Sequence, residues 1–244
     1  MIDLGAGTGA NLRYAAPLIG GPQEWLLVDN EPALLEAAQG LLRTSPLPAC
    51  RVRCIALDLA TQLDRVPLRS GTLLTASALL DLVSEEWLRA LVRRAADVAA
   101  PVWFTLAYDG HIVCDPAEPE DREIQELFNL HQLTDKGFGA ALGPGAGRMA
   151  QQILLQHGYQ VQGAPSDWHI GPDRAALQHA LLEGWCQAAT QIAPHRTAAL
   201  RDWLTRRRAH VDAARSKLRV GHVDMVGHPV GDAAGHKVHN KVVN

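Results

Sequence analysis

Apolar runs of strand length alternate with helix-length stretches over the first two thirds of the chain, and this alternation constrains the fold most. Strands separated by helices are joined by crossovers into a parallel sheet with helices on both faces. We therefore expect an α/β fold with a doubly wound, mostly parallel seven-stranded sheet. The predicted strands are residues 2–4, 25–28, 52–57, 73–77, 102–107, 159–162 and 218–225. The predicted helices lie near residues 9–19, 32–44, 85–99, 120–134, 147–157, 173–192 and 195–216.

The length of 244 residues fits one α/β domain with additions. Two segments, 108–147 and 169–216, are longer than a normal crossover. Long insertions at strand ends are often functional lids, so we expect helical lid insertions here, with simple structural elaboration as the alternative. The chain then divides into a single domain over residues 1–229 and a flexible tail over residues 230–244.

The composition is that of a globular protein, with 47% hydrophobic and 20% charged residues. A net charge of −3 lacks the positive field that holds phosphate backbones, so we expect no nucleic-acid partner. The basic run at residues 206–208 is interpreted as a solvated helix face, with an RNA-binding face as the alternative. The start of the chain lacks the pattern of a secretory signal, and the most apolar run, residues 72–83, is too short to cross a membrane. We therefore expect a cytoplasmic protein with no membrane partner.

The first predicted strand runs directly into a glycine-rich turn, with the sequence Asp-Leu-Gly-Ala-Gly-Thr-Gly from Asp3 to Gly9. Glycine permits positive φ and lets the backbone approach a ligand without a Cβ in the way. The spacing is GxGxG, whereas the dinucleotide fingerprint GxGxxG places a pyrophosphate on a helix N-terminus. The acid at Asp3 would repel a pyrophosphate but suits a ligand with cationic groups.

Acidic residues also close the next strands. Asp29 ends the second strand, Asp58 ends the third, and Asp81 follows the fourth. A carboxylate at the position of Asp29 is able to accept hydrogen bonds from both hydroxyls of a ribose. Helix capping by Asp29 and Asp58 is the alternative explanation.

The combination of DxGxGxG with these strand-end acids resembles the class I S-adenosylmethionine (SAM) methyltransferases over residues 1 to about 110. The resemblance implies SAM as the cofactor and an antiparallel pair formed by the last two predicted strands. The contacts it implies are Asp3, Gly5, Gly7 and Gly9 with the methionine part, Asn11 as a weaker candidate for its carboxylate, Asp29 and Asn30 with ribose, Asp58 and Leu59 with adenine, and Ser77 and Ala78 beneath the sulfonium.

Members of that family normally carry a helical segment before this motif, whereas Met1 here already lies within the first strand. We expect either that the start codon is assigned too late or that the sequence is truncated. The resemblance then implies a cofactor pocket that is open on one side.

The region after the fourth strand lacks the Asn-Pro-Pro-aromatic signature of related enzymes that methylate planar amides or nucleobases. Together with the acidic balance, this favours a small-molecule methyl acceptor. Methyl transfer depends mostly on in-line alignment, and a base is needed only if the nucleophile must lose a proton. The candidate bases are Tyr108 and Asp109 after the fifth strand and His131 on the expected lid helix. We expect no metal, because Asp81 and Asp109 lack a clear third oxygen ligand.

Two other functions stay open from the sequence. A non-catalytic partner protein with the same fold would keep the cofactor motifs without a base. A Rossmann-type oxidoreductase using NAD is disfavoured by the GxGxG spacing and by Asp3. The oligomeric state is left open.

Overall fold

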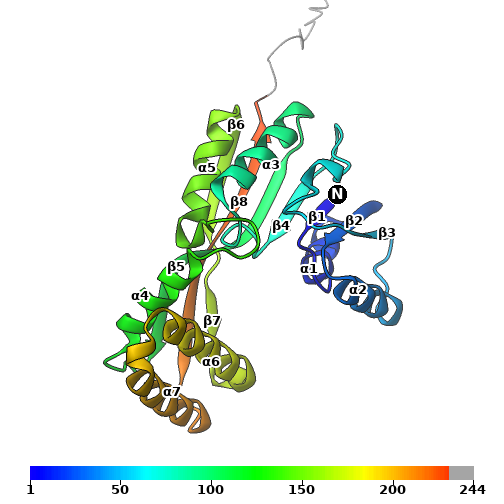
Figure 1. Ribbon diagram of the computed structural model, residues 1–244. Coiled ribbons are helices and arrows are strands. Elements are labelled where there is room, and N and C mark those ends of the chain that lie inside the picture. Colours follow the sequence, from blue (N-terminus) through cyan, green and yellow to red (C-terminus); the bar gives the residue numbers. More distant parts are fainter. Residues whose placement is uncertain (231–244) are drawn as a thin grey trace, which may run out of the picture.

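The computed structural model describes residues 1–230, so almost all of the predicted tail, 230–244, lies outside the described residues. These residues form one eight-stranded sheet in the order β3-β2-β1-β4-β5-β8-β6, with β7 paired to β8 (Figure 1). Strands β1 to β5 pair in parallel, and β8 runs antiparallel to β5, β6 and β7. The strands are β1 (Ile2–Leu4), β2 (Gln23–Asp29), β3 (Cys50–Ala56), β4 (Leu74–Ser77), β5 (Val102–Asp115), β6 (Tyr159–Pro165), β7 (Trp168–Ile170) and β8 (Lys217–Pro229).

The expected fold class is confirmed, with two differences in the sheet. The three-residue strand β7 was not predicted, because so short a segment carries no alternation that marks it as a strand. Strand β5 continues well past the predicted end, and the partner that extends it, β8, lies more than 100 residues away in the sequence.

All seven predicted helices are present. Helices α1 and α2 pack on one face of the sheet, and α3 and α5 pack on the opposite face (Figure 1). Ser84 caps α3 by accepting a hydrogen bond from the Trp87 amide at 3.3 Å, as its position before two glutamates predicts. The helices are α1 (Ala10–Ile19), α2 (Pro32–Thr44), α3 (Glu85–Asp97), α4 (Asp121–Gln132), α5 (Ala146–Gln156), α6 (Ala175–Ile192) and α7 (Thr197–Asp212), with short 3-10 turns η1 (Leu63–Arg65), η2 (Gly143–Gly145), η3 (Pro172–Arg174) and η4 (Pro194–Arg196).

Strand β1 lies at the centre of the sheet although it has only three residues. Asp3 stands opposite Leu27 of β2 on one side and Thr75 of β4 on the other, so both edges of the strand are paired. The strand order reverses direction between β1 and β4, and open α/β sheets bind ligands outside the carboxyl ends of strands at such a switch point. The glycine turn after β1 therefore opens onto this edge.

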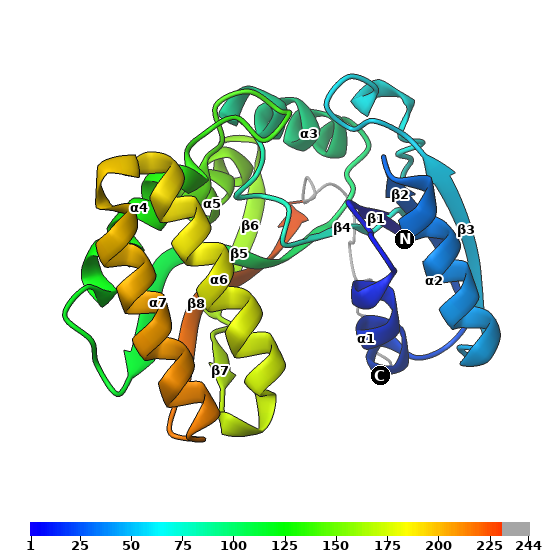
Figure 2. The ribbon, with the colours of Figure 1, turned by 60° about the horizontal axis from the view of Figure 1, so that its bottom comes forward.

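Strands β5 and β8 run on together beyond β4, with β7 paired to β8 there, and helices α4, α6 and α7 pack against this extension (Figure 2). The two long predicted insertions thus join into one helical layer with its own apolar core. Ile112, Leu182, Trp185 and Trp203 are among the buried residues of this core. Whether the layer acts as a lid stays a prediction.

The prediction of a solvated face for the basic run is wrong at Arg207. Its side chain is fully buried and pairs with Asp121 at the start of α4, which also accepts a hydrogen bond from the Trp203 indole at 2.8 Å. Arg206 pairs with Glu118 just ahead of the same helix. The run therefore anchors α7 to α4, because its charges meet acids that lie far away in sequence.

Within residues 1–230, no helix combines the length and the apolar character needed to cross a membrane.

Candidate functional site

The glycine turn is held to the end of β2 by the carboxylate of Asp29. Its Oδ2 accepts a hydrogen bond from the Gly7 amide at 2.8 Å, and its Oδ1 accepts one from the Glu31 amide at 3.0 Å. A carboxylate offers about four acceptor sites, so each oxygen keeps a lone pair for a ligand. Asp29 thus stands ready to accept two hydroxyls while it fixes the turn beside it.

All three glycines of the turn have a positive φ that favours glycine, but the space around them differs. Gly5, Gly7 and Gly9 have φ of 62°, 53° and 73°, where side chains are strained. A Cβ on Gly5 would lie 3.3 Å from the Leu79 side chain, and one on Gly9 would lie 3.3 Å from Leu27. A Cβ on Gly7 would meet nothing within 4 Å. The backbone of Gly7 is therefore the part of the turn that a ligand is able to approach.

Asp3 is fully buried under the turn, and half of its carboxylate is unused. Oδ1 accepts a hydrogen bond from the Asn11 side chain at 2.8 Å, and Asn11 also donates to the Thr75 hydroxyl at 3.1 Å. Oδ2 is buried and has no hydrogen-bond partner in the described residues. Burial raises the pKa of Asp3 to about 7, against the opposing effect of the Asn11 hydrogen bond. A buried carboxylate oxygen without a partner is costly, and a cationic donor from a ligand would remove that cost.

The residues expected to contact adenine are placed less clearly. Asn30 is exposed just beyond β2. Asp58 is also exposed, and its two oxygens accept hydrogen bonds from the Ala60 amide at 3.0 Å and the Thr61 hydroxyl at 2.8 Å. These bonds close a local turn rather than cap a helix, since the N-cap of the following 3-10 turn is Gln62. Leu59 is buried in the main core. A contact of Asp58 and Leu59 with adenine stays a prediction.

The end of β4 places two further predicted residues beside the turn. Ala78 adopts φ of 52°, and its amide donates to the Thr105 carbonyl of β5 at 3.0 Å. Ser77 lines a cavity of about 410 Å³ between α1 and strands β4, β5 and β8. Asn11 lines the same cavity, so the cavity adjoins the pair of Asn11 and Asp3. Its lining residues are Ala10, Asn11, Tyr14, Ser77, Trp103, Thr105, Leu106, Ser166 and Asp224.

Tyr108 and Asp109, two of the predicted bases, point to other partners. Tyr108 is buried against the helical layer, its hydroxyl donates to Asn129 Oδ1 at 2.8 Å, and burial raises its pKa further above the ordinary value. Asp109 accepts a hydrogen bond from the His111 amide at 2.9 Å and pairs with the His111 ring at 3.1 Å. Neither residue lines the cavity.

His131, the third predicted base, links two helices of the layer. Its Nε2 lies 2.9 Å from Gln191 Oε1 on α6, and its Nδ1 lies 3.2 Å from Lys136 Nζ. It does not line the cavity either. The structure therefore brings the glycine turn, Asp3, Asn11, Asp29 and Ser77 together but leaves the three predicted bases elsewhere; their catalytic roles stay predictions.

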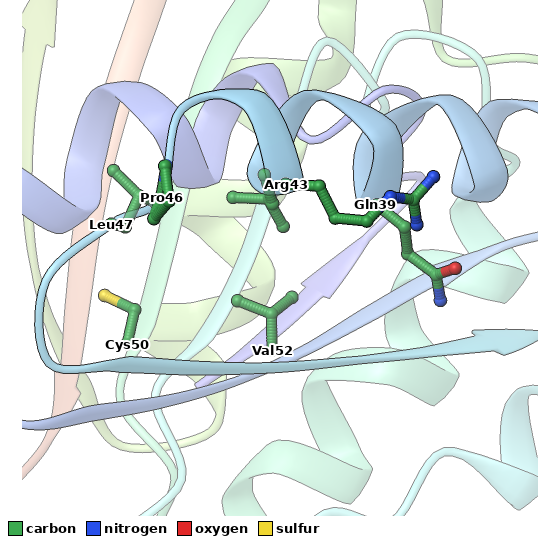
Figure 3. A pocket seen from close by; sticks show the side chains of 7 residues that line it. Gln39, Arg43, Pro46, Leu47, Cys50 and Val52 are labelled. Carbon is green, nitrogen blue, oxygen red and sulfur yellow. The ribbon is translucent and has the colours of Figure 1, made fainter.

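A second cavity, of about 360 Å³, lies between α2 and β3 and is lined in part by Gln39, Arg43, Cys50 and Val52 (Figure 3). Cys50 is the first residue of β3, so this cavity adjoins the amino end of that strand. Ligands of open α/β sheets bind at the opposite, carboxyl edge. None of the predicted site residues lines it.

Nowhere in residues 1–230 do three or more His, Cys, Asp or Glu side chains gather in a way that would hold a metal ion.

Seven residues that line the cavity beside Ser77 were not among the predicted site residues: Ala10, Tyr14, Trp103, Thr105, Leu106, Ser166 and Asp224. One signal was available. Asp224 is an acidic residue inside a predicted strand whose neighbours are Val223 and Met225, and a charge at such a position needs a partner or a purpose. The residues of β5 and Ser166 carry no local signal, since only the pairing of β5, β8 and β6 brings them to the cavity. Ala10 and Tyr14 flank the predicted Asn11 on α1.

The strand order, the antiparallel last strands and the glycine turn clamped by a strand-end aspartate together define a class I methyltransferase fold. Residues 1–102 match the family model described as a methyltransferase domain. The resemblance inferred from the motifs is thereby confirmed.

Solved structures agree with this fold. YcgJ from Bacillus subtilis aligns with a TM-score of 0.50 and 16% identity, over 94% of this chain and 92% of its own. A protein of Bacillus halodurans C-125, provisionally described as a methyltransferase, aligns with a TM-score of 0.52 and 12% identity, over 93% and 91%. At these identities the likeness concerns the fold alone. A search of curated proteins found no matching sequence.

Proposed function

We propose that the protein is a SAM-dependent methyltransferase that transfers a methyl group to a small-molecule acceptor. The observation that carries the proposal is the pair of aspartates around the glycine turn. Asp29 keeps free lone pairs at the end of β2, and Asp3 keeps an unpartnered buried oxygen beneath the turn. The first suits the two hydroxyls of a ribose, and the second suits the ammonium group of a methionine chain.

The residues fit SAM in this arrangement. Asp29 would hold the ribose, the Gly7 backbone would lie along the methionine chain, and Asp3 with Asn11 would receive its polar end. The cofactor supplies an activated methyl group on a sulfonium. The role of the protein is to hold that methyl group in line with the acceptor at the end of β4, where Ser77 and Ala78 lie.

A small acceptor is supported by the cavity beside Ser77. Its volume of about 410 Å³ is in the range of small-molecule sites, roughly 300–1,000 Å³. One observation favours a non-catalytic, cofactor-binding protein as the second candidate: Tyr108, Asp109 and His131 all lie outside this cavity. Because methyl transfer to an unprotonated nucleophile needs no base, that observation does not decide between the two.

Calorimetric titration with S-adenosylhomocysteine (SAH) and SAM tests the cofactor assignment. We expect micromolar dissociation constants for both and no binding of NADH. Absence of SAH binding by the folded protein would overturn the proposal. A screen of metabolite fractions with methyl-labelled SAM then separates an enzyme, which yields a labelled product, from a binding protein, which yields none.

A pH dependence of cofactor binding follows from Asp3. The free protein holds a proton on Asp3 up to about pH 7, and a cationic ligand needs the ionised form, so SAH affinity is expected to rise between about pH 6 and pH 8. Asp3→Asn is expected to remove most of this rise and to weaken binding by about tenfold at pH 8. Calorimetry over that range checks both, and an unchanged pH profile in the variant would contradict the role of Asp3.

The stability of the free protein is expected to change in the opposite direction. Because the pKa of Asp3 is raised from 3.8 to about 7 on folding, the folded state binds more protons between these values. The contribution of Asp3 protonation to the free energy of unfolding is complete below about pH 4 and is lost as the pH rises to about 7. Urea unfolding of the wild type and of Asp3→Asn over this pH range measures how the free energy of unfolding of each changes with pH.

A further inference from the structure

We propose that the cavity between α1 and strands β4, β5 and β8 binds the methyl acceptor, and that this acceptor is an organic amine held by the carboxylate of Asp224. The inference rests on the proposed function, since it names the substrate class of the same site.

Asp224 lines this cavity, and one of its two carboxylate oxygens is engaged by the protein. Its Oδ1 accepts two hydrogen bonds, from the Leu106 amide at 2.8 Å and from the Ser166 hydroxyl at 2.6 Å. Its Oδ2 accepts none from any residue in the described part of the chain, and the side chain is only half-buried. The carboxylate is therefore fixed in position by one oxygen and available to a ligand through the other.

The backbone of β5 is distorted to make this arrangement. The register of β5 against β8 shifts between Phe104 and Ala107, and Leu106 within the shift adopts φ of 55°. A non-glycine residue with positive φ inside a strand is strained, and such bulges recur beside active sites. Here the bulge supplies the amide that holds Asp224, whereas a regular strand would spend that amide on the ladder.

The charges around the cavity favour a cation. Asp224 is the one acidic residue among the nine that line it, and they include no lysine, arginine or histidine. Asp3 lies next to the cavity, behind Asn11, and adds no positive charge. A carboxylate with a free oxygen in a partly enclosed site binds an ammonium group more strongly than the same pair would bind in water.

Two aromatic residues suit the same ligand class. Tyr14 of α1 and Trp103 of β5 line the cavity together with Asp224. Aromatic faces attract cations and also accept the apolar body that carries an amine. Tyr14 is 71% exposed and contributes little to the core, so a ligand would give this ring its packing partner.

The cavity lies beside the proposed cofactor position and shares part of its lining. Asn11 and Ser77 belong to both, and the cofactor ammonium already has Asp3 as its partner. Asp224 is thus left for a second cationic group, on the side of Ser77 where the methyl acceptor must lie.

The test uses three amines, each paired with the alcohol of the same carbon skeleton: phenethylamine with 2-phenylethanol, cyclohexylamine with cyclohexanol, and hexylamine with hexanol. Binding to the full protein saturated with SAH is followed by the indole resonance of Trp103, which Trp103→Phe identifies. At least one amine is expected to bind about tenfold or more tightly than its alcohol, and Asp224→Asn is expected to remove that preference. Asp167→Asn is the matched control, because Asp167 is a nearby carboxylate that lies outside the cavity and pairs with Arg219.

Tyr14→Ala provides a second variant that leaves the core untouched and is expected to weaken the amine about threefold or more. The proposal is overturned if no amine binds more tightly than its alcohol, or if Asp224→Asn leaves the preference intact. A loss of SAH affinity in Asp224→Asn also overturns it, because Asp224 would then belong to the cofactor site. Failure of the wild type to bind SAH at all is a different result, which removes the proposed function itself.

Discussion

Asp29→Asn is expected to weaken the binding of SAH by about 100-fold or more. Two charge-assisted hydrogen bonds to the ribose would be lost, each contributing roughly 1.5–3 kcal/mol. The asparagine amide would also turn its two donor hydrogens toward the Gly7 or the Glu31 amide, which are donors themselves. The substitution therefore disturbs both the ligand contact and the clamp on the turn.

Calorimetry of SAH binding measures this effect, and thermal unfolding without ligand shows whether the variant is folded. Asp173→Asn serves as the matched control, because Asp173 is an exposed carboxylate in the helical layer. A folded Asp29→Asn variant that binds SAH within threefold of the wild type would contradict the assignment of Asp29 to the ribose.

Gly7→Ala is the second substitution with a large expected effect, a loss of SAH affinity of about 100-fold. The added Cβ meets no protein atom within 4 Å, so it would project into the space that the ligand needs. The fold is expected to tolerate the change, since alanine at positive φ costs only about 1 kcal/mol.

Gly21→Ala separates backbone strain from the steric effect. Gly21 has φ of 68°, compared with 53° at Gly7, and its added Cβ also meets nothing within 4 Å, but it lies in the turn between α1 and β2. Both variants are expected to lose similar amounts of thermal stability, whereas Gly7→Ala alone loses SAH binding. Equal binding by the two variants would mean that the ligand does not approach the backbone of Gly7.

Local patterns were enough to predict the part of the molecule that resembles the methyltransferases. The short strand that contains Asp3, the positive φ of the glycines and the strand-end position of Asp29 all depend on residues next to one another in sequence. Composition and hydrophobic periodicity carry that information directly. The same holds for the cap of α3 at Ser84.

The remainder depends on contacts between residues far apart in sequence. Tyr108 was a reasonable candidate base by its place after a strand, but Asn129 of α4 engages its hydroxyl. Arg207 was expected at the surface because it lies in a run of three arginines, but Asp121 pairs with it in the fold. Asp224 gained its place only through the register shift in β5. Sequence alone does not contain these pairings.

The extended pair of β5 and β8 has a mechanical consequence. Helices α4, α6 and α7 pack against the extension of β5 and β8, so their position relative to the cavity depends on how these two strands pair. The pairing of these strands is interrupted twice, between Phe104 and Ala107 and between Tyr108 and Ile112. The first interruption also supplies the Leu106 amide that holds Asp224, so a change in strand pairing there would shift the carboxylate proposed to bind an amine.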